Sequence, residues 1–356
     1  MIIQASELKH KLKKLSPLKT ETYWFDVDGI LAQDSDAWGV VDGPKFGGTF
    51  SIAGRKLSSV VSRMSGQIEI VQQGNKLILT SAKARVELEI QPTKSKVLPE
   101  APEKFFPLNA KNLKRALSIA CSSASPAKSA AFGGVVQIRS LPLGLASDTP
   151  PGYRVAGTDS LVLTVVDTPE PVPFEFKTLL NLTAAGVVQL MDGDTFEIGE
   201  TETSVCVKSD DTTVYASKPM QKYPDFSAHL AAQPTIKFGF KSQDLLSALR
   251  TVEPLMDESV DQGGVALHFG QSVLQCSSVG VGSTARDEAV CEQIDPDPVF
   301  DPQDVELRLS AKYLSGFLSR AGETAVFGYR TKDEPVRMES DGIIVMVKSM
   351  TVKEKK

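Results

Sequence analysis

Cysteine and histidine are both scarce in this chain of 356 residues, which has four of the first and three of the second. No Cys-x-x-Cys pair or cysteine–histidine cluster occurs, so we expect no metal site and no cofactor. The scattered cysteines also argue against a disulfide framework and favour a reducing cytoplasm. The histidines lie far apart without a matching carboxylate motif, so no pattern for a histidine-based catalytic triad remains.

Long apolar runs are missing too. No stretch reaches the roughly 20 apolar residues that span a bilayer. Lysines interrupt the first helical stretch before any apolar segment, so we expect no secretory signal peptide. Neither a GxxxxGK[ST] loop nor a GxGxxG motif after a predicted strand occurs, so the sequence contains no common nucleotide-binding motif.

The net charge is -5 and the isoelectric point is about 5.5. This acidic balance argues against a protein that coats nucleic acid with its whole surface. It is compatible with one basic face on an otherwise acidic molecule. The distribution of lysine and arginine is therefore more informative than their sum.

An internal repeat is the main positive feature of the sequence. A short alternating strand, an amphipathic helix and two further alternating strands occur in this order three times, beginning near residues 48, 172 and 305. In each copy, apolar residues first alternate and then change to helical spacing. Leu57 and Val61 form one such helical stripe, and Leu314 and Phe317 form another.

A second shared element precedes each copy. Residues 5–15, 109–120 and 241–252 carry leucines at helical spacing, and strand-like hairpins follow each of them. Proline-rich or charged stretches at 91–104 and 223–235 are typical of linkers. We therefore predict an α+β chain of three repeated domains, 1–98, 104–224 and 234–356, each with two helices packed on antiparallel sheet. Pairing the open sheet edges head to tail would close such a chain into a ring.

Three segments resemble the bacterial-type DNA polymerase sliding clamp, the beta subunit of DNA polymerase III. They are FSIAGRKLSSVVSRMSGQIEIVQQGNKLILTSAKARVEL at 50–88, RVAGTDSLVLTVVD at 154–167 and KYPDFSAHL at 222–230. The resemblance implies the DNA clamp fold and a homodimeric ring of six similar domains. It also implies a non-catalytic processivity factor that encircles double-stranded DNA and binds DNA polymerase and clamp loader through short peptide motifs.

A clamp must hold DNA and still slide, so its contacts should be electrostatic and independent of base sequence. Lysine and arginine on the inward helices suit this role, and several of the predicted helices carry them. The candidate DNA-binding residues are Lys9, Lys11, Lys13, Lys14, Arg55, Lys56, Arg63, Lys111, Lys114, Arg115, Lys177, Lys241, Arg250, Lys312 and Arg320.

The resemblance also implies a hydrophobic pocket for partner peptides and a dimer contact. The matching pocket positions are Phe132, Gly134, Thr158, Asp159, Leu163, Met346, Val347 and Met350. The matching dimer positions are Val86, Leu88, Leu255 and Met256. Ser160, Leu161 and Val162 replace the family's usual Gly-His-Arg, which suggests a pocket tuned to a different peptide, as in a divergent, phage-like replication system.

Two other interpretations stay open. YWFDVDGIL at 23–31 resembles the first motif of haloacid-dehalogenase phosphatases, with Asp26 as nucleophile, Asp28 as general acid and Asp210 with Asp211 as a magnesium pair. The segment after it is not helical, however, and Asp-Gly between apolar runs is a strong hairpin signal. The other interpretation is a clamp-fold scaffold that binds proteins without encircling DNA.

Overall fold

The chain is described by a computed structural model. It describes residues 1–349 except 28, 45, 47, 95, 125–133, 142–151, 174, 220–221, 257–263, 271, 281–282, 295–305 and 332–333. The chain divides into two compact units, each assembled from separate segments. The first unit contains 1–118, 135–153 and 169–220, and the second contains 119–134, 154–168 and 221–356. The predicted boundaries of three domains stay a prediction.

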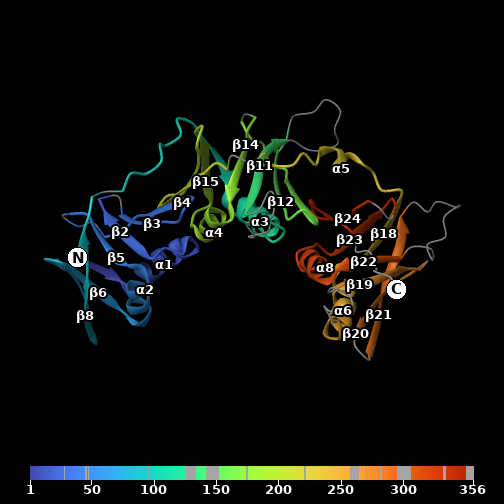
Figure 1. The fold of residues 1–356 in the computed structure, drawn as a ribbon, viewed down its shortest axis with the longest axis horizontal. Helices are drawn as coiled ribbons and strands as arrows, with labels where there is room; N and C mark the ends of the chain where they lie inside the picture. Colours follow the sequence, from blue (N-terminus) through green and yellow to red (C-terminus); the bar gives the residue numbers. More distant parts are fainter. Residues whose placement is uncertain are drawn as a thin grey trace, which may run out of the picture. The chain divides into compact units, whose positions relative to one another are not determined.

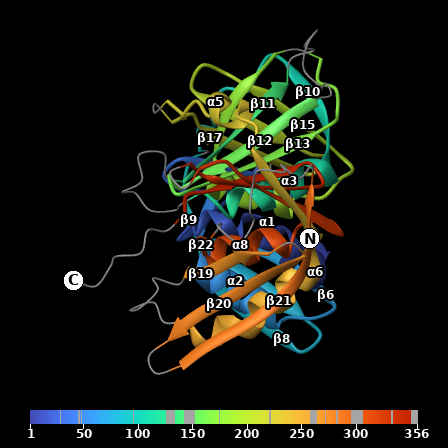
Figure 2. The same ribbon diagram turned by 90° about the vertical axis from the view of Figure 1, so that its right-hand side faces the viewer.

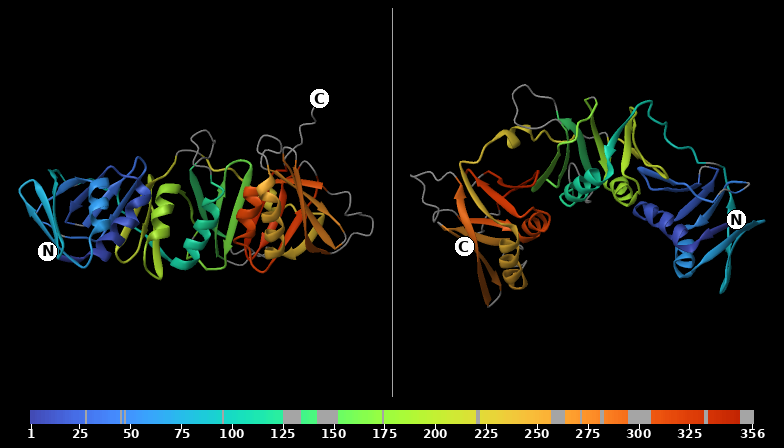
Figure 3. Two further views of the ribbon diagram at one scale, coloured as in Figure 1. Left: turned by 90° about the horizontal axis from the view of Figure 1, so that it is seen from below. Right: turned by 180° about the vertical axis from the view of Figure 1, so that it is seen from behind.

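The first unit opens with two copies of one motif, a strand, a helix and three antiparallel strands. The first copy is β1 (Ile2–Gln4), α1 (Ala5–Leu15), β2 (Thr22–Asp26), β3 (Gly29–Gln33) and β4 (Ala37–Val41), with a 3-10 turn at Ser16–Leu18. The second is β5 (Phe50–Ala53), α2 (Gly54–Arg63), β6 (Gln67–Gln73), β7 (Lys76–Ser81) and β8 (Ala84–Glu89). The two helices pack against each other and lie side by side in Figures 1 and 3.

The same motif recurs in the middle of the chain. One copy is β10 (Phe105–Asn109), α3 (Ala110–Cys121), β11 (Val135–Leu141), β12 (Gly152–Thr158) and β13 (Val162–Thr168). The next is β14 (Lys177–Asn181), α4 (Leu182–Leu190), β15 (Thr195–Glu200), β16 (Ser204–Lys208) and β17 (Thr212–Ser217). In the first unit one sheet has the order β10-β15-β16-β17-β4-β3-β2-β5-β9, where β9 is Gln91–Pro92. Another has the order β1-β6-β7-β8.

The second unit adds two further copies. One is β18 (Ile236–Lys241), α6 (Ser242–Val252), β19 (Gly264–Phe269), β20 (Val273–Gly280) and β21 (Ser283–Ile294), with a 3-10 turn at Glu253–Leu255. The other is β22 (Glu306–Ser310), α8 (Ala311–Leu318), β23 (Thr324–Tyr329), β24 (Val336–Ser340) and β25 (Ile343–Val347). The short helix α5 (Ser227–Ala231) precedes them. The hairpin of β20 and β21 is prominent in Figure 2.

The apolar pattern explains these elements. In α1 the buried leucines Leu8, Leu12 and Leu15 recur every three or four residues and form one face of the helix. In the second unit, Phe238, Phe269 and Phe327 meet in the core, with ring centroids 4.4 Å apart for the first pair and 6.0 Å for Phe269 and Phe327. No helix among the described residues is long and apolar enough to cross a membrane.

Burial also accounts for the chemistry of the cysteines. Cys206, Cys276 and Cys291 are buried free thiols, and Cys121 is half-buried. Burial raises the pKa of Cys206 and of Cys276 to about 12, and that of Cys291 to about 11. These thiols are therefore protonated and unreactive near neutral pH, as structural cysteines are.

Candidate functional site

An apolar pocket of about 260 Å³, which we call the β13–β25 pocket, lies in the second unit. Its floor comes from two paired strands, where Leu163 of β13 faces Met346 of β25 across the antiparallel ladder. Side chains directly opposite in such a ladder share one face of the sheet, so these two form one apolar surface. Met346 is buried and Leu163 is half-buried, which leaves part of that surface open.

One side of the pocket is a tight turn, which we call the rim turn, at residues 158–162. The Asp159 carboxylate accepts hydrogen bonds from the amides of Leu161 and Val162, both at 2.9 Å. The Thr158 hydroxyl donates to the carbonyl of Val162 at 2.7 Å. Ser160 and Leu161, at the tip of the turn, line the pocket, and Leu161 is 58% exposed.

Another part of the lining comes from the segment that joins the middle of the chain to β18. Pro224, Phe226 and His229 line the pocket there. Tyr223 anchors this segment because its buried hydroxyl donates to the Ala156 carbonyl at 2.9 Å. Burial raises the pKa of Tyr223 far above its usual value, so the hydroxyl stays a donor. An anchored wall, a rigid ladder and a tight turn together make a preformed apolar pocket.

The structure brings together only part of the predicted pocket. Thr158, Leu163 and Met346 line it, and Asp159 holds the rim turn from behind. Val347 is buried and Gly134 is half-buried, and neither lines the pocket. The two remaining predicted positions, Phe132 and Met350, lie outside the described residues.

Sequence reasoning missed one part of the wall of this pocket. The missed lining residues are Pro224, Asp225, Phe226, His229 and Pro335, whereas Ser160, Leu161, Val162 and Lys348 stand at positions where the sequence departs from the family's pocket pattern. One signal was present, because the Tyr-Pro-Asp-Phe segment at 223–226 resembles the family's linker. Its position beside Met346 depends on the fold and could not be read from the spacing of residues.

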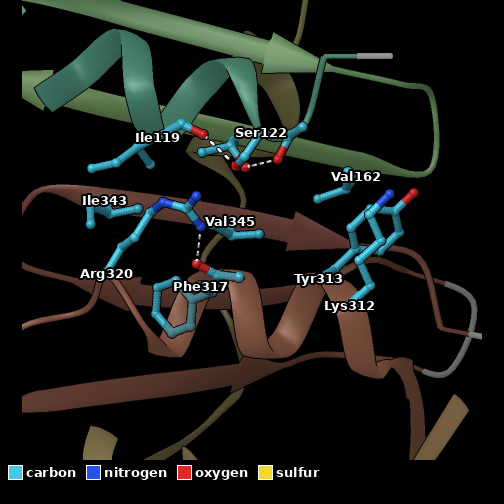
Figure 4. Close-up of a pocket in the computed structure, with 12 residues that line it drawn as sticks. Ile119, Ser122, Val162, Lys312, Tyr313, Phe317, Arg320, Ile343 and Val345 are labelled. Atoms are coloured by element: carbon cyan, nitrogen blue, oxygen red, sulfur yellow. Dashed lines mark hydrogen bonds between the residues drawn. The ribbon is translucent and has the colours of Figure 1, made fainter. Parts of the chain in front are cut away.

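A second pocket of about 220 Å³, which we call the α8 pocket, lies between helix α8, the end of α3 and strands β13 and β25 (Figure 4). Its interior is lined by Ile119, Phe317 and Val345. The exposed cations Lys312 and Arg320 also line it and lie on opposite sides in Figure 4. Arg320 donates to the Gly316 carbonyl at 2.7 Å.

Tyr313 connects the two pockets. Its ring lines the α8 pocket, and its hydroxyl donates to the Asp159 carboxylate at 2.5 Å. Burial, and then the contact with Asp159, raise the pKa of Tyr313 far above its usual value. The hydroxyl is therefore a permanent donor to the residue that holds the rim turn.

The predicted DNA-binding cations are exposed, half-buried or buried. Most are exposed, namely Lys13, Arg55, Lys56, Arg63, Lys111, Arg115, Lys177, Lys241, Arg250, Lys312 and Arg320. Lys9 and Lys11 are half-buried, and Lys11 lies 3.6 Å from Glu7. The half-buried Lys114 donates to the Met191 carbonyl and lies 5.3 Å from the centre of the Phe196 ring, so much of its donor capacity is used inside the first unit.

The interpretation of Lys14 as a DNA contact is wrong. Its side chain is only 1% exposed, and its ammonium lies 2.6 Å from the carboxylates of both Asp192 and Asp211. Burial by itself would lower the pKa of Lys14, but the two carboxylates outweigh burial and the pKa is raised. Lys14 is therefore a charged crosslink within the first unit and has no surface left for a phosphate.

The predicted dimer residues are also divided. In the described part of the chain, β8 pairs only with β7 and is the edge of its sheet, which leaves backbone groups for another strand. Val86 on that strand is half-buried, while Leu88 is buried inside the first unit. Leu255, just after α6, is 39% exposed, and Met256 is half-buried.

The phosphatase interpretation fails on the local fold. Strand β2 turns directly into antiparallel β3, with Asp26 opposite Gly29, where a phosphatase would need a helix. The Asp26 carboxylate accepts from the Val27 amide and the Thr49 hydroxyl, and Asp28 lies outside the described residues. Asp211 is paired with Lys14, and the described residues contain no cluster of side chains able to hold a metal ion.

The six-fold succession of strand, helix and three strands is that of the DNA clamp fold, as predicted. Solved structures with this fold match nearly the whole chain. They include the DNA polymerase III beta subunit of Thermotoga maritima, with 15% identity and a TM-score of 0.83 over 99% of both chains. A putative beta subunit from Eubacterium rectale has 12% identity and a TM-score of 0.82 over 98% of both chains.

A third match is a sliding clamp from Pseudomonas aeruginosa bound to griselimycin, with 15% identity and a TM-score of 0.80 over 99% of both chains. No protein-family model and no curated protein matches the sequence. At identities this low, the comparisons establish the fold, and the function has to be argued from the site.

Proposed function

We propose that this chain is a DNA sliding clamp, a non-catalytic processivity factor that encircles duplex DNA as a homodimer and tethers a DNA polymerase. The observation that carries the proposal is the match to sliding clamps over 99% of the chain, at a TM-score of 0.83 for the Thermotoga maritima protein. The match extends over nearly the whole chain and is not limited to one copy of the repeated motif, which supports the proposal. The proposed place of action is the cytoplasm, at a nucleoid or a viral replication site.

The exposed cations on the helices support the DNA part of the proposal. Arg55, Lys56 and Arg63 on α2, Arg250 on α6 and Lys312 on α8 all present their charge to solvent. Such side chains bind phosphates without reading base edges, and they allow sliding because each contact is replaceable by the next phosphate. Lys14 takes no part in this set, for the reason given above.

The β13–β25 pocket supports the tethering part. Its floor of Leu163 and Met346 suits an apolar side chain, and its preformed walls reduce the entropy lost on binding. We propose that short peptide motifs of the polymerase and of a clamp loader dock there. The exposed Leu161 on the rim stands where the family resemblance implies a histidine, so this pocket is more apolar than the family's. A more apolar pocket fits a peptide of a divergent, phage-like system.

A protein-binding scaffold without DNA encirclement is the second candidate. The net charge of -5 and the internal engagement of Lys14 and Lys114 favour it, because they reduce the positive charge available to DNA. It would share the fold and the pocket. The two candidates therefore differ in DNA association and not in partner binding.

The deciding experiment measures solution mass and then topology. Light scattering should give about 77 kDa for a two-chain ring of 38.4 kDa subunits. After loading, the protein should stay on circular duplex DNA and slide off the same DNA once it is linearised. A monomer at every concentration that is retained on neither form would overturn the clamp proposal and favour the scaffold.

A further inference from the structure

The rim turn adopts a conformation that needs support from outside. Ser160 has a φ of 78°, in the left-handed region that residues other than glycine rarely adopt. Such a conformation persists only where surrounding contacts determine it. Because Ser160 and Leu161 line the β13–β25 pocket, the shape of this side of the pocket depends on those contacts.

The Asp159 carboxylate supplies part of that support and is itself held from a distant helix. One carboxylate oxygen accepts the amides of Leu161 and Val162, and the other accepts the hydroxyl of Tyr313. Tyr313 stands 154 residues further along the chain, in the first turn of α8. A hydrogen bond to a charged acceptor is stronger than one between neutral groups, so Tyr313 restrains both the position and the rotation of the carboxylate.

The rim turn has two other sets of contacts, one within the turn and one from the end of β25. The Thr158 hydroxyl bonds within the turn, to the Val162 carbonyl and from the Ser160 amide. The Lys348 amide donates to the Leu161 carbonyl at 3.0 Å and ties the turn to the end of β25. Tyr313 is thus the side chain by which α8 fixes the turn.

We infer that Tyr313 is a positioning residue of the β13–β25 pocket, whose hydroxyl fixes Asp159 and thereby the pocket-lining tip of the rim turn. The inference rests on the proposed function only in taking the pocket to be the docking site for partner peptides. Two neighbouring residues of α8 then have different roles. Lys312 presents a charge to solvent, and Tyr313 shapes the pocket.

The sharpest variant is Tyr313→Phe, which keeps the ring in the α8 pocket and removes only the hydroxyl. Ser315→Ala is the matched control, because it removes a hydroxyl from the same helix that, among the described residues, bonds only to the Lys312 carbonyl. The first readout is hydrogen exchange at the amides of Leu161 and Val162. We expect exchange at least about fivefold faster in Tyr313→Phe and unchanged in Ser315→Ala.

The second readout is affinity for griselimycin, the ligand of the Pseudomonas aeruginosa clamp, measured by calorimetry on the full chain. We expect Tyr313→Phe to weaken binding about tenfold and to have no further effect once Asp159→Ala has removed the acceptor. Met346→Ala, which truncates the floor of the pocket, reports whether the probe occupies it.

The outcomes separate the two ideas. Unchanged amide exchange in Tyr313→Phe overturns the positioning role, whatever griselimycin does. Faster exchange with additive effects of the Tyr313 and Asp159 variants also overturns it, because the two residues would then act independently. Faster exchange in a protein whose wild type fails to bind griselimycin supports the positioning role and counts against the pocket as a docking site.

Discussion

Helices α1 and α2 of the first unit are both rich in lysine and arginine, yet the structure treats their charges differently. On α1, Lys14 is buried between Asp192 and Asp211, Lys11 lies near Glu7, and His10 contacts Asp192 at 2.5 Å. On α2, no ion pair of the basic residues occurs among the described residues. Lysine and arginine on a helix therefore indicate a DNA-binding surface only where the fold brings no carboxylates close enough to pair with them.

The largest effect that this comparison predicts is on stability. Lys14→Met should lower the free energy of unfolding by about 2 kcal/mol, because it leaves two carboxylates close together without their shared cation. Lys13→Ala, an exposed neighbour on the same helix, should change it by less than about 0.5 kcal/mol. Urea denaturation followed by circular dichroism measures both. Equal losses in the two variants would refute the crosslink.

The same cluster predicts a pH dependence. The hydrogen bond from Lys14 is the main cause that lowers the pKa of Asp192, and Lys14 with Thr212 outweighs burial to lower that of Asp211. A carboxyl whose pKa is lowered by folding stabilises the protein above its usual value of 3.8 and loses this contribution as the pH falls through the folded value.

The stability difference between wild type and Lys14→Met should therefore be full at pH 6 and should shrink below about pH 4. Denaturation midpoints at a series of pH values measure it. A difference that stays constant down to pH 2 would show that Lys14 acts by packing alone.

On α2 we expect an effect on DNA and almost none on stability. Replacing Arg55, Lys56 and Arg63 by alanine should weaken DNA association. It should also reduce the slope of log association constant against log salt concentration by about 0.9 for each phosphate that the variant no longer neutralises. The urea midpoint should stay within the range of ordinary surface substitutions. Lys14→Met serves as the reverse control, with lower stability and an unchanged slope. Identical slopes for wild type and the α2 variant would place the DNA-binding surface elsewhere.

The smallest expected effect is at Lys11. Its contact with Glu7 joins successive turns of α1 at 3.6 Å, with Glu7 more than half exposed. Such pairs contribute about 0.3 kcal/mol and are screened by salt. Lys11→Gln should therefore be nearly silent in urea denaturation, and a loss above about 1 kcal/mol would mean that α1 carries a second buried crosslink.

The sequence predicted what depends on local spacing. The helices expected at 5–15, 109–120 and 241–252 occur as α1 (Ala5–Leu15), α3 (Ala110–Cys121) and α6 (Ser242–Val252). The repeat was also predicted, although the structure shows a finer unit of one strand, one helix and three strands, which occurs six times in the described part of the chain. Apolar periodicity identifies such elements because each one has to bury a face of its own.

The rest depends on contacts between distant positions. Lys14 and Asp211 are 197 residues apart, so a lysine that looked like its neighbours in the sequence became a buried crosslink. The pocket behaved in the same way. Leu163 and Met346 were predicted through the family resemblance, but Pro224 and His229 line the pocket in a segment that long-range contacts hold, among them the hydrogen bond from the Tyr223 hydroxyl to Ala156.

The pairing of β13 with β25 has a consequence for the synthesis of the chain. Strand β13 emerges from the ribosome long before β25, and all of α6, α8 and the strands around them are made in between. Until residue 346 has been made, the edge of β13 has no partner strand and the β13–β25 pocket has no floor. A nascent or prematurely terminated chain that lacks β25 therefore cannot form this pocket. A partner that docks there binds only chains whose synthesis has passed β25.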